Sequence, residues 1–209
     1  MTEYLIPTGR AETELVEKRS RFIGQVWLVE SEEAARACIE SARKRHYDAR
    51  HHCWCWRLKD GPERYSDDGE PQGTAGQPML NVFQREDITN VCCVVTRYFG
   101  GILLGAGGLV RAYTQAAKLA LDAAGISVVR RWVEAAVPCP YALFERVKQE
   151  VEGCGGALGE TEYAAEVTVH ALLPEGKVED FTLRLTELTA GGLAPIVAGE
   201  QFRGVPRKL

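Results

Sequence analysis

The chain has 209 residues, of which 45% are hydrophobic and 26% charged, and its formal net charge is −4 at pH 7. This composition is typical of a globular protein and excludes a disordered chain or a coiled coil, while the slightly acidic balance excludes a general electrostatic attraction to nucleic acid. No apolar run reaches the ~18 residues that a membrane span requires, and the segment MTEYLIPTGRAETELVEK lacks the basic start and apolar stretch of a secretory signal. We therefore expect a cytoplasmic protein with no membrane partner.

The first part of the chain predicts three strands and a helix. Residues 12–29 indicate two strands around a turn near Arg19, because β-branched and aromatic residues recur at every second position. A helix begins after Ser31, a plausible N-cap, with acidic residues in its first turn and basic residues in its last. Residues 51–58, HHCWCWRL, form the third strand.

Residues 60–76, DGPERYSDDGEPQGTAG, are dense in turn formers and predict a long irregular loop, here called the acidic loop. Such a loop within a compact domain is often functional, and we expect it to face solvent and to contribute little to folding. Its carboxylates Asp67, Asp68 and Glu70 could hold magnesium or act as a base, or they could only cap turns. A helix over 74–87 and a strand over 90–99, apolar on both faces and so central in its sheet, follow.

The segment YFGGILLGAGGLVRAY, residues 98–113, places glycines between that strand and a helix that runs from Leu109 to Gly125. Residues 98–108 are here called the glycine loop. No Walker or dinucleotide-binding pattern is present, but backbone N–H groups at a helix start between two arginines can bind an anion. Close packing is the alternative use of the same glycines. The predicted anion-binding residues are Arg97, Gly100, Gly101, Gly105, Gly107, Gly108 and Arg111.

The last part of the chain predicts the element order strand, helix, strand, strand, helix, strand, as in a split-βαβ ferredoxin-like unit. The predicted bounds are 128–137, 141–152, 157–163, 166–173, 177–189 and 195–202. We place a domain boundary near Ser127, which gives domains 1–127 and 128–209.

His51, Cys53 and Cys55 share one face of a strand, where they could bind zinc or supply a thiol nucleophile. No second ligand pair follows, and the seven cysteines lie mostly in apolar segments, so we expect buried free thiols, no metal and no cofactor. The basic run RKRHYDAR, residues 43–50, could contact phosphate, although a helix end explains most of its charge.

Two segments, YSDDGEPQGTAGQPML (65–80) and VVTRYFGGILLGAGGLVRAY (94–113), resemble the YigZ/IMPACT family, and the resemblance extends over essentially the whole chain. It implies an α+β protein. The N-terminal domain would be similar to ribosomal protein S5 domain 2, and the smaller ferredoxin-like domain to elongation factor G domain V. It also implies a role in translation or its regulation, and no catalytic activity.

We therefore predict a non-enzymatic regulator associated with translation, whose N-terminal domain binds RNA or a ribosome-associated partner, with no sequence-specific DNA binding. A protein-only interaction module that regulates translation or a stress response is the first alternative. A phosphate-binding enzyme of the S5-like fold, acting on a small molecule or nucleotide, is the second; no Ser or Thr stands at the helix start to meet magnesium. The predicted partner-binding residues are His51, Asp67, Asp68, Glu70 and Thr74.

Overall fold

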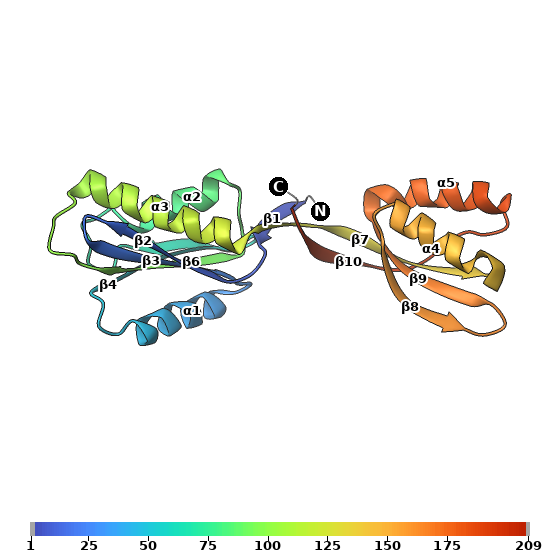
Figure 1. Cartoon of the computed structure of the whole chain (residues 1–209), viewed down its shortest axis with the longest axis horizontal. Coiled ribbons are helices and arrows are strands. Elements are labelled where there is room, and N and C mark those ends of the chain that lie inside the picture. Colours follow the sequence, from blue (N-terminus) through green and yellow to red (C-terminus); the bar gives the residue numbers. More distant parts are fainter. Residues whose placement is uncertain (1–2, 208–209) are drawn as a thin grey trace. The chain divides into compact units, whose positions relative to one another are not determined.

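The computed structural model describes residues 3–207, which divide into two compact units (Figure 1). Residues 4–129 and 204–207 form one unit, here called the N-terminal unit, and residues 130–203 with Glu3 form the C-terminal unit. Both units combine helices with a sheet of antiparallel strands, so the predicted α+β class is confirmed.

The N-terminal unit is built on a sheet with the strand order β2-β3-β6-β4-β5. The five strands are β2 (Ala11–Glu17), β3 (Ser20–Leu28), β4 (His51–Arg57), β5 (Glu63–Ser66) and β6 (Val91–Tyr98). Helices α2 (Gly76–Arg85) and α3 (Ala106–Ala124) pack on one face of this sheet, and α1 (Glu32–Arg45) packs on the other. The central strand β6 is buried on both faces, as its continuous apolar run predicts.

Local signals determine α1 closely. The Ser31 hydroxyl accepts a hydrogen bond from the Ala34 N–H at 3.2 Å, and acidic and basic residues occupy the first and last turns as the helix dipole favours. The predicted cap and helix are confirmed. The helical spacing of apolar residues from Leu109 predicts that Leu119 and Ala123 lie on the buried face of α3. This is wrong at both positions, because Leu119 is 37% exposed and Ala123 is exposed, whereas Leu121 is buried.

The C-terminal unit contains β7 (Ile126–Cys139), α4 (Phe144–Gly153), β8 (Ala157–Tyr163), β9 (Val167–Pro174), α5 (Val178–Thr189) and β10 (Ile196–Pro206). The strands lie in the order β10-β7-β9-β8, and the two helices share one core with the sheet. The predicted order strand, helix, strand, strand, helix, strand is confirmed.

Strands β7 and β10 also supply residues to the N-terminal unit. There β1 (Tyr4–Pro7) pairs antiparallel with residues 126–129 of β7, and Arg207 donates its backbone N–H to the Ile126 carbonyl at 2.8 Å. Among residues 3–207, no helix is both long and apolar enough to cross a membrane.

Candidate functional site

The acidic loop is folded around Asp67. One carboxylate oxygen of Asp67 accepts hydrogen bonds from the N–H groups of Ala75 (3.0 Å) and Gly76 (2.9 Å), and the other accepts from Gly73 (2.8 Å). These donors lie at and before the start of α2, whose N-cap Ala75 has no capping side chain. Asp67 therefore caps α2 from within the acidic loop, eight and nine residues before the Ala75 and Gly76 donors, and its negative charge favours that helix end.

Asp68 joins the same loop to β4 and α1. Its carboxylate accepts from the His52 backbone N–H at 2.7 Å and from the Arg43 guanidinium at 3.1 Å, and its carbonyl accepts from His51 Nδ1 at 2.9 Å. Its backbone has a φ of 40°, in the left-handed region that Asp tolerates better than most residues. The loop therefore has one defined conformation against the sheet.

Glu70 lies in the interior with Arg97 and Tyr113. Its Oε1 accepts from Arg97 Nη1 at 2.6 Å and from the Tyr113 hydroxyl at 2.8 Å, and the Glu70 and Arg97 side chains are only 4% and 7% exposed. Burial is the main cause that raises the pKa of Tyr113, so this phenol stays a donor. Glu70 thus connects the acidic loop to the end of β6 and to α3, which both flank the glycine loop.

Two expectations are corrected by these contacts. The acidic loop is neither irregular nor solvent-facing throughout, since residues Glu63–Ser66 form the edge strand β5, and Glu70 and Thr74 are buried. Arg97 does not stand beside Arg111 at the glycine loop, because its guanidinium pairs with Glu70 in the interior. The local sequence pattern reveals neither the burial of these loop residues nor the pairing of Arg97 with Glu70, because the contacting residues are far apart in the sequence.

The cysteines of β4 do not form a reactive site. Cys53 and Cys55 are fully buried, and burial is the main cause that raises the pKa of both thiols. His51 is hydrogen-bonded to the acidic loop. Within residues 3–207, no three His, Cys, Asp or Glu side chains come together in a way that could hold a metal ion.

Packing explains some of the loop glycines. A Cβ at Gly100 would lie 2.0 Å from the carbonyl carbon of Arg19, in the turn between β2 and β3, so only glycine fits there. A Cβ at Gly108 would lie 2.9 Å from the Leu104 Cβ. Gly105, the N-cap of α3, has a φ of 70° that favours glycine, and Gly101 shares this property with a φ of 84°.

Packing does not explain Gly107. It is a helical residue of α3, where glycine costs about 1 kcal/mol relative to alanine. The nearest atom to a Cβ placed there would be Arg111 Nη1, at 3.6 Å, which is an ordinary contact. The Arg111 guanidinium therefore lies over the first turn of α3, beside backbone N–H groups that have no acceptor within the helix.

A small cavity of about 130 Å³ lies at this turn. Its lining includes Glu17, Lys18, Leu104, Gly108, Arg111 and Gln115. Gly105 provides no capping side chain, and the first turn of α3 contains no acidic residue. The cavity combines two cations with a helix N-terminus, which is an arrangement suited to an anion, although the carboxylate of Glu17 is also present.

Sequence reasoning missed the two cations of the β2–β3 turn. Lys18 and Arg19 are exposed, and Gly100 donates its N–H to the Ser20 hydroxyl at 3.2 Å, which holds the turn against the glycine loop. No ion pair joins Lys18, Arg19 or Arg111 to an acid in the part of the chain that the structure describes. The sequence signal that could have indicated them is the pair of adjacent cations, Lys18 and Arg19, in a predicted hairpin turn.

Exposed apolar side chains follow the end of β6. Leu103 is 82% exposed, Phe99 50% and Ile102 40%. The glycine loop therefore presents apolar side chains, and the β2–β3 turn held against it carries the cations Lys18 and Arg19. Such a mixture is typical of surfaces that bind macromolecules.

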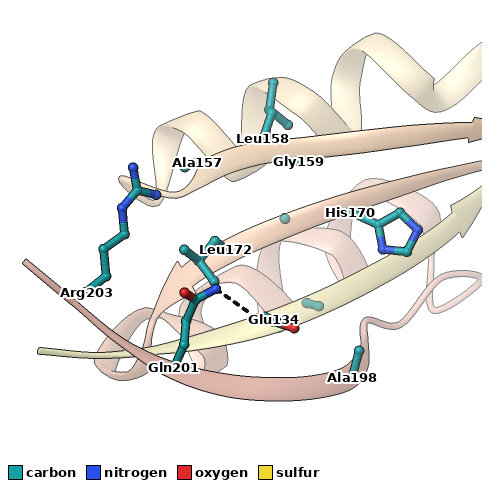
Figure 2. A pocket seen from close by; sticks show the side chains of 11 residues that line it. Glu134, Ala157, Leu158, Gly159, His170, Leu172, Ala198, Gln201 and Arg203 are labelled. Atoms are coloured by element: carbon teal, nitrogen blue, oxygen red, sulfur yellow. Dashed lines mark hydrogen bonds between the residues drawn. The ribbon is translucent and has the colours of Figure 1, made fainter.

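The C-terminal unit has a larger cavity, of about 280 Å³, on its sheet (Figure 2). Leu158 and Leu172 contribute apolar surface, Gln201 donates to Glu134 at 2.8 Å, and Arg203 extends at one end. No residue predicted for the functional site lies here.

Comparison with known proteins relates both units to described domains. Residues 18–121 match the Impact N-terminal domain, and residues 137–191 match DUF1949, a domain of unknown function. The first match contains the acidic and glycine loops, and the second covers most of the C-terminal unit.

Similar proteins extend over nearly the whole chain. IMPACT family member YigZ of Escherichia coli is 36% identical over 92% of this chain and 97% of its own length. IMPACT family member YvyE of Bacillus subtilis is 35% identical over 90% and 88%. A crystal structure described as that of a hypothetical protein has 35% identity and a TM-score of 0.59, and the match covers 95% of this chain and 98% of that one.

Proposed function

The chain belongs to the IMPACT family, and from this premise we propose that it is a non-enzymatic cytoplasmic regulator of translation that binds RNA, free or in a ribosomal particle, through its glycine loop. The observation that carries the proposal is the group of exposed cations Lys18, Arg19 and Arg111, which have no acidic partner within residues 3–207. Lys18 and Arg111 line the cavity at the uncapped N-terminus of α3, and Arg19 follows Lys18 in the same turn.

Phosphate is the ligand group that this surface suits. Arginine offers paired donors to phosphate oxygens, and the first-turn N–H groups add neutral donors and a favourable dipole. Glycine at position 107 leaves the backbone open between them. The overall charge of −4 restricts electrostatic attraction to this local patch.

The acidic loop supports the same surface indirectly. In the proposal Asp67, Asp68 and Glu70 hold the loop, β6 and α3 in place, and the RNA contacts belong to the glycine loop and the β2–β3 turn. His51 and Thr74 share the positioning role, since His51 donates to the Asp68 carbonyl and the Thr74 hydroxyl donates to the Pro71 carbonyl at 2.6 Å.

We also propose the finer fold relationships and the domain boundary. The N-terminal domain, residues 1–127, is similar to ribosomal protein S5 domain 2, and the C-terminal domain, residues 128–209, is ferredoxin-like. The strand order β10-β7-β9-β8 with both helices in one core supports the second relationship.

A protein-only partner is the main rival, and the exposed Leu103 and Phe99 side chains favour it. The full chain is used to pull down its partners from an extract of the native cell, with and without nuclease treatment. This experiment separates RNA binding from binding to a protein alone. Under the proposal RNA or ribosomal particles are recovered and nuclease removes them. A partner that survives nuclease and binds without RNA would favour the protein-only function.

The recovered RNA then provides a quantitative test. Binding is measured at several salt concentrations for the unmodified chain and for Arg111→Gln, and loss of one phosphate contact is expected to reduce the log–log salt slope by about 0.7. Arg85→Gln is the matched control, because Arg85 is exposed at the end of α2, close to the Glu86–Lys118 ion pair. Equal affinity and slope for both variants would overturn the anion site.

A further inference from the structure

The N-terminal unit contains two pairs of neighbouring cysteines, one on each face of its sheet. Side chains alternate along β6, so Cys92 faces α1 whereas Cys93 faces α2 and α3. Cys38 of α1 packs against the core on the first side, and Cys55 of β4 is directly opposite Cys93 on the second.

The Cys92 sulfur touches α1 next to Cys38. Cys92 Sγ donates to the Ala35 carbonyl at 3.6 Å, and Ala35 stands three residues before Cys38 on the helix. Helical side chains lean back over the preceding turn, so the Cys38 sulfur extends toward the same carbonyl. The two thiols therefore meet between α1 and β6.

The environments of these two sulfurs differ. Cys38 is partly exposed, whereas Cys92 is completely buried. The hydrogen-bonding interaction with Cys92 is the main cause that lowers the pKa of Cys38, and the charge of Arg10 also lowers it, against an opposing effect of burial. The Cys92 pKa is raised well above its ordinary value by the same interaction and by burial. This combination suits an attacking thiolate with a resolving thiol beside it.

The second pair lacks the exposed member. Cys55 and Cys93 are both fully buried, and burial is the main cause that raises the pKa of Cys55. An oxidant in water cannot reach either sulfur while the unit is folded. This pair is therefore an internal control for the first.

We propose that Cys38 and Cys92 form an oxidisable thiol pair, which hydrogen peroxide converts into a disulfide that links α1 to β6. The Cys38 thiolate attacks one peroxide oxygen, the O–O bond breaks, and hydroxide leaves and takes a proton to become water. Cys38 is then a sulfenic acid. Cys92 sulfur attacks the Cys38 sulfur, the S–O bond breaks, and the thiol proton leaves with the hydroxyl group as a second water. One peroxide is reduced and two thiols are oxidised.

The test treats the reduced full chain with hydrogen peroxide, blocks remaining thiols by alkylation after unfolding, and maps the products by mass spectrometry. We expect a loss of two hydrogen atoms per chain, a Cys38–Cys92 linkage, and reversal by dithiothreitol. Cys38 should be oxidised at least about tenfold faster than Cys55. Retention of all seven thiols, or a first linkage between Cys55 and Cys93, would overturn the proposal.

Single variants distinguish the attacking role of Cys38 from the resolving role of Cys92. Cys38→Ser should form no disulfide, and Cys92→Ala should gain oxygen at Cys38 as sulfenic and then sulfinic acid, because the resolving thiol is absent. Cys93→Ala, a matched buried change, should still form the Cys38–Cys92 linkage. If Cys38 collects oxygen equally in the unmodified chain and in Cys92→Ala, Cys92 is not the resolving thiol and the inference fails. Circular dichroism establishes that each variant is folded.

Discussion

Truncation of Glu70 to alanine is expected to destabilise the N-terminal unit by about 3–5 kcal/mol, the usual cost of breaking a buried ion pair. Glu70 and Arg97 are 4% and 7% exposed, so the change would leave a guanidinium charge in the interior with little water to solvate it. The Tyr113 hydroxyl would lose its acceptor at the same time.

The expected cost of Glu70→Ala is large compared with the total free energy of unfolding of a domain. Domains are stable by about 5–15 kcal/mol, so Glu70→Ala would remove a substantial fraction of the free energy of unfolding. The costs of the unpaired guanidinium and the unpaired phenol are not added, because both groups share one carboxylate oxygen.

Urea unfolding monitored by tryptophan fluorescence provides the assay. Three of the four tryptophans lie in the N-terminal unit, and a Trp132→Phe background in all variants removes the signal of the C-terminal unit. Glu14→Ala is the control, because Glu14 forms an exposed ion pair with Arg21, for which a cost below about 1 kcal/mol is expected.

A loss for Glu70→Ala no larger than that for Glu14→Ala would refute the reasoning. A combined replacement of Glu70, Arg97 and Tyr113 by Leu, Met and Phe should cost less than Glu70→Ala alone, because no charge or hydroxyl then remains unpaired. If the combined variant is the less stable of the two, desolvation is not the source of the cost.

Asp67→Ala should lower the urea midpoint by an amount equivalent to about 2 kcal/mol, since a helix cap is lost, and Asp67→Asn should recover part of it. Gly100→Ala should destabilise the unit, whereas Gly107→Ala should stabilise it by up to about 1 kcal/mol in the same experiment; the opposite order would contradict the packing argument. Burial, followed by the charge of Arg45, lowers the pKa of His46. Its folded-state pKa is therefore below the unfolded value, and its contribution to stability is present above the unfolded pKa of about 6.5 and is lost as the pH falls below it. His46→Gln should weaken the decline in stability between pH 7.5 and 5.5, and an unchanged decline would exclude His46 as a cause.

The elements that sequence predicts well are those determined by near neighbours. Ser31 caps a helix three residues away, and the continuous apolar run of β6 predicts a central strand without reference to the rest of the chain. The strands and helices of the C-terminal unit are also predicted from the local sequence, because Gly and Pro mark their ends.

The candidate site depends instead on contacts between distant residues. Glu70 bonds residues that are 27 and 43 positions later, and the same carboxylate in sequence resembles an ordinary turn residue. The sequence likewise predicts that Arg97 faces an anion, because its buried partner Glu70 cannot be identified from neighbouring residues. Proximity of the β2–β3 turn to Gly100 spans 80 positions, which no local pattern can show.

The return of β10 to the N-terminal unit affects the order in which the chain can fold as it is synthesised. Residues 204–207 belong to the unit formed by residues 4–129, yet residues 130–203 separate them. At about 5–20 residues per second this interval lasts roughly 4–15 s. During that time the N-terminal unit exists without residues 204–207, and the Ile126 carbonyl lacks the hydrogen bond that the Arg207 N–H later donates. The C-terminal unit must therefore be synthesised before the N-terminal one is complete.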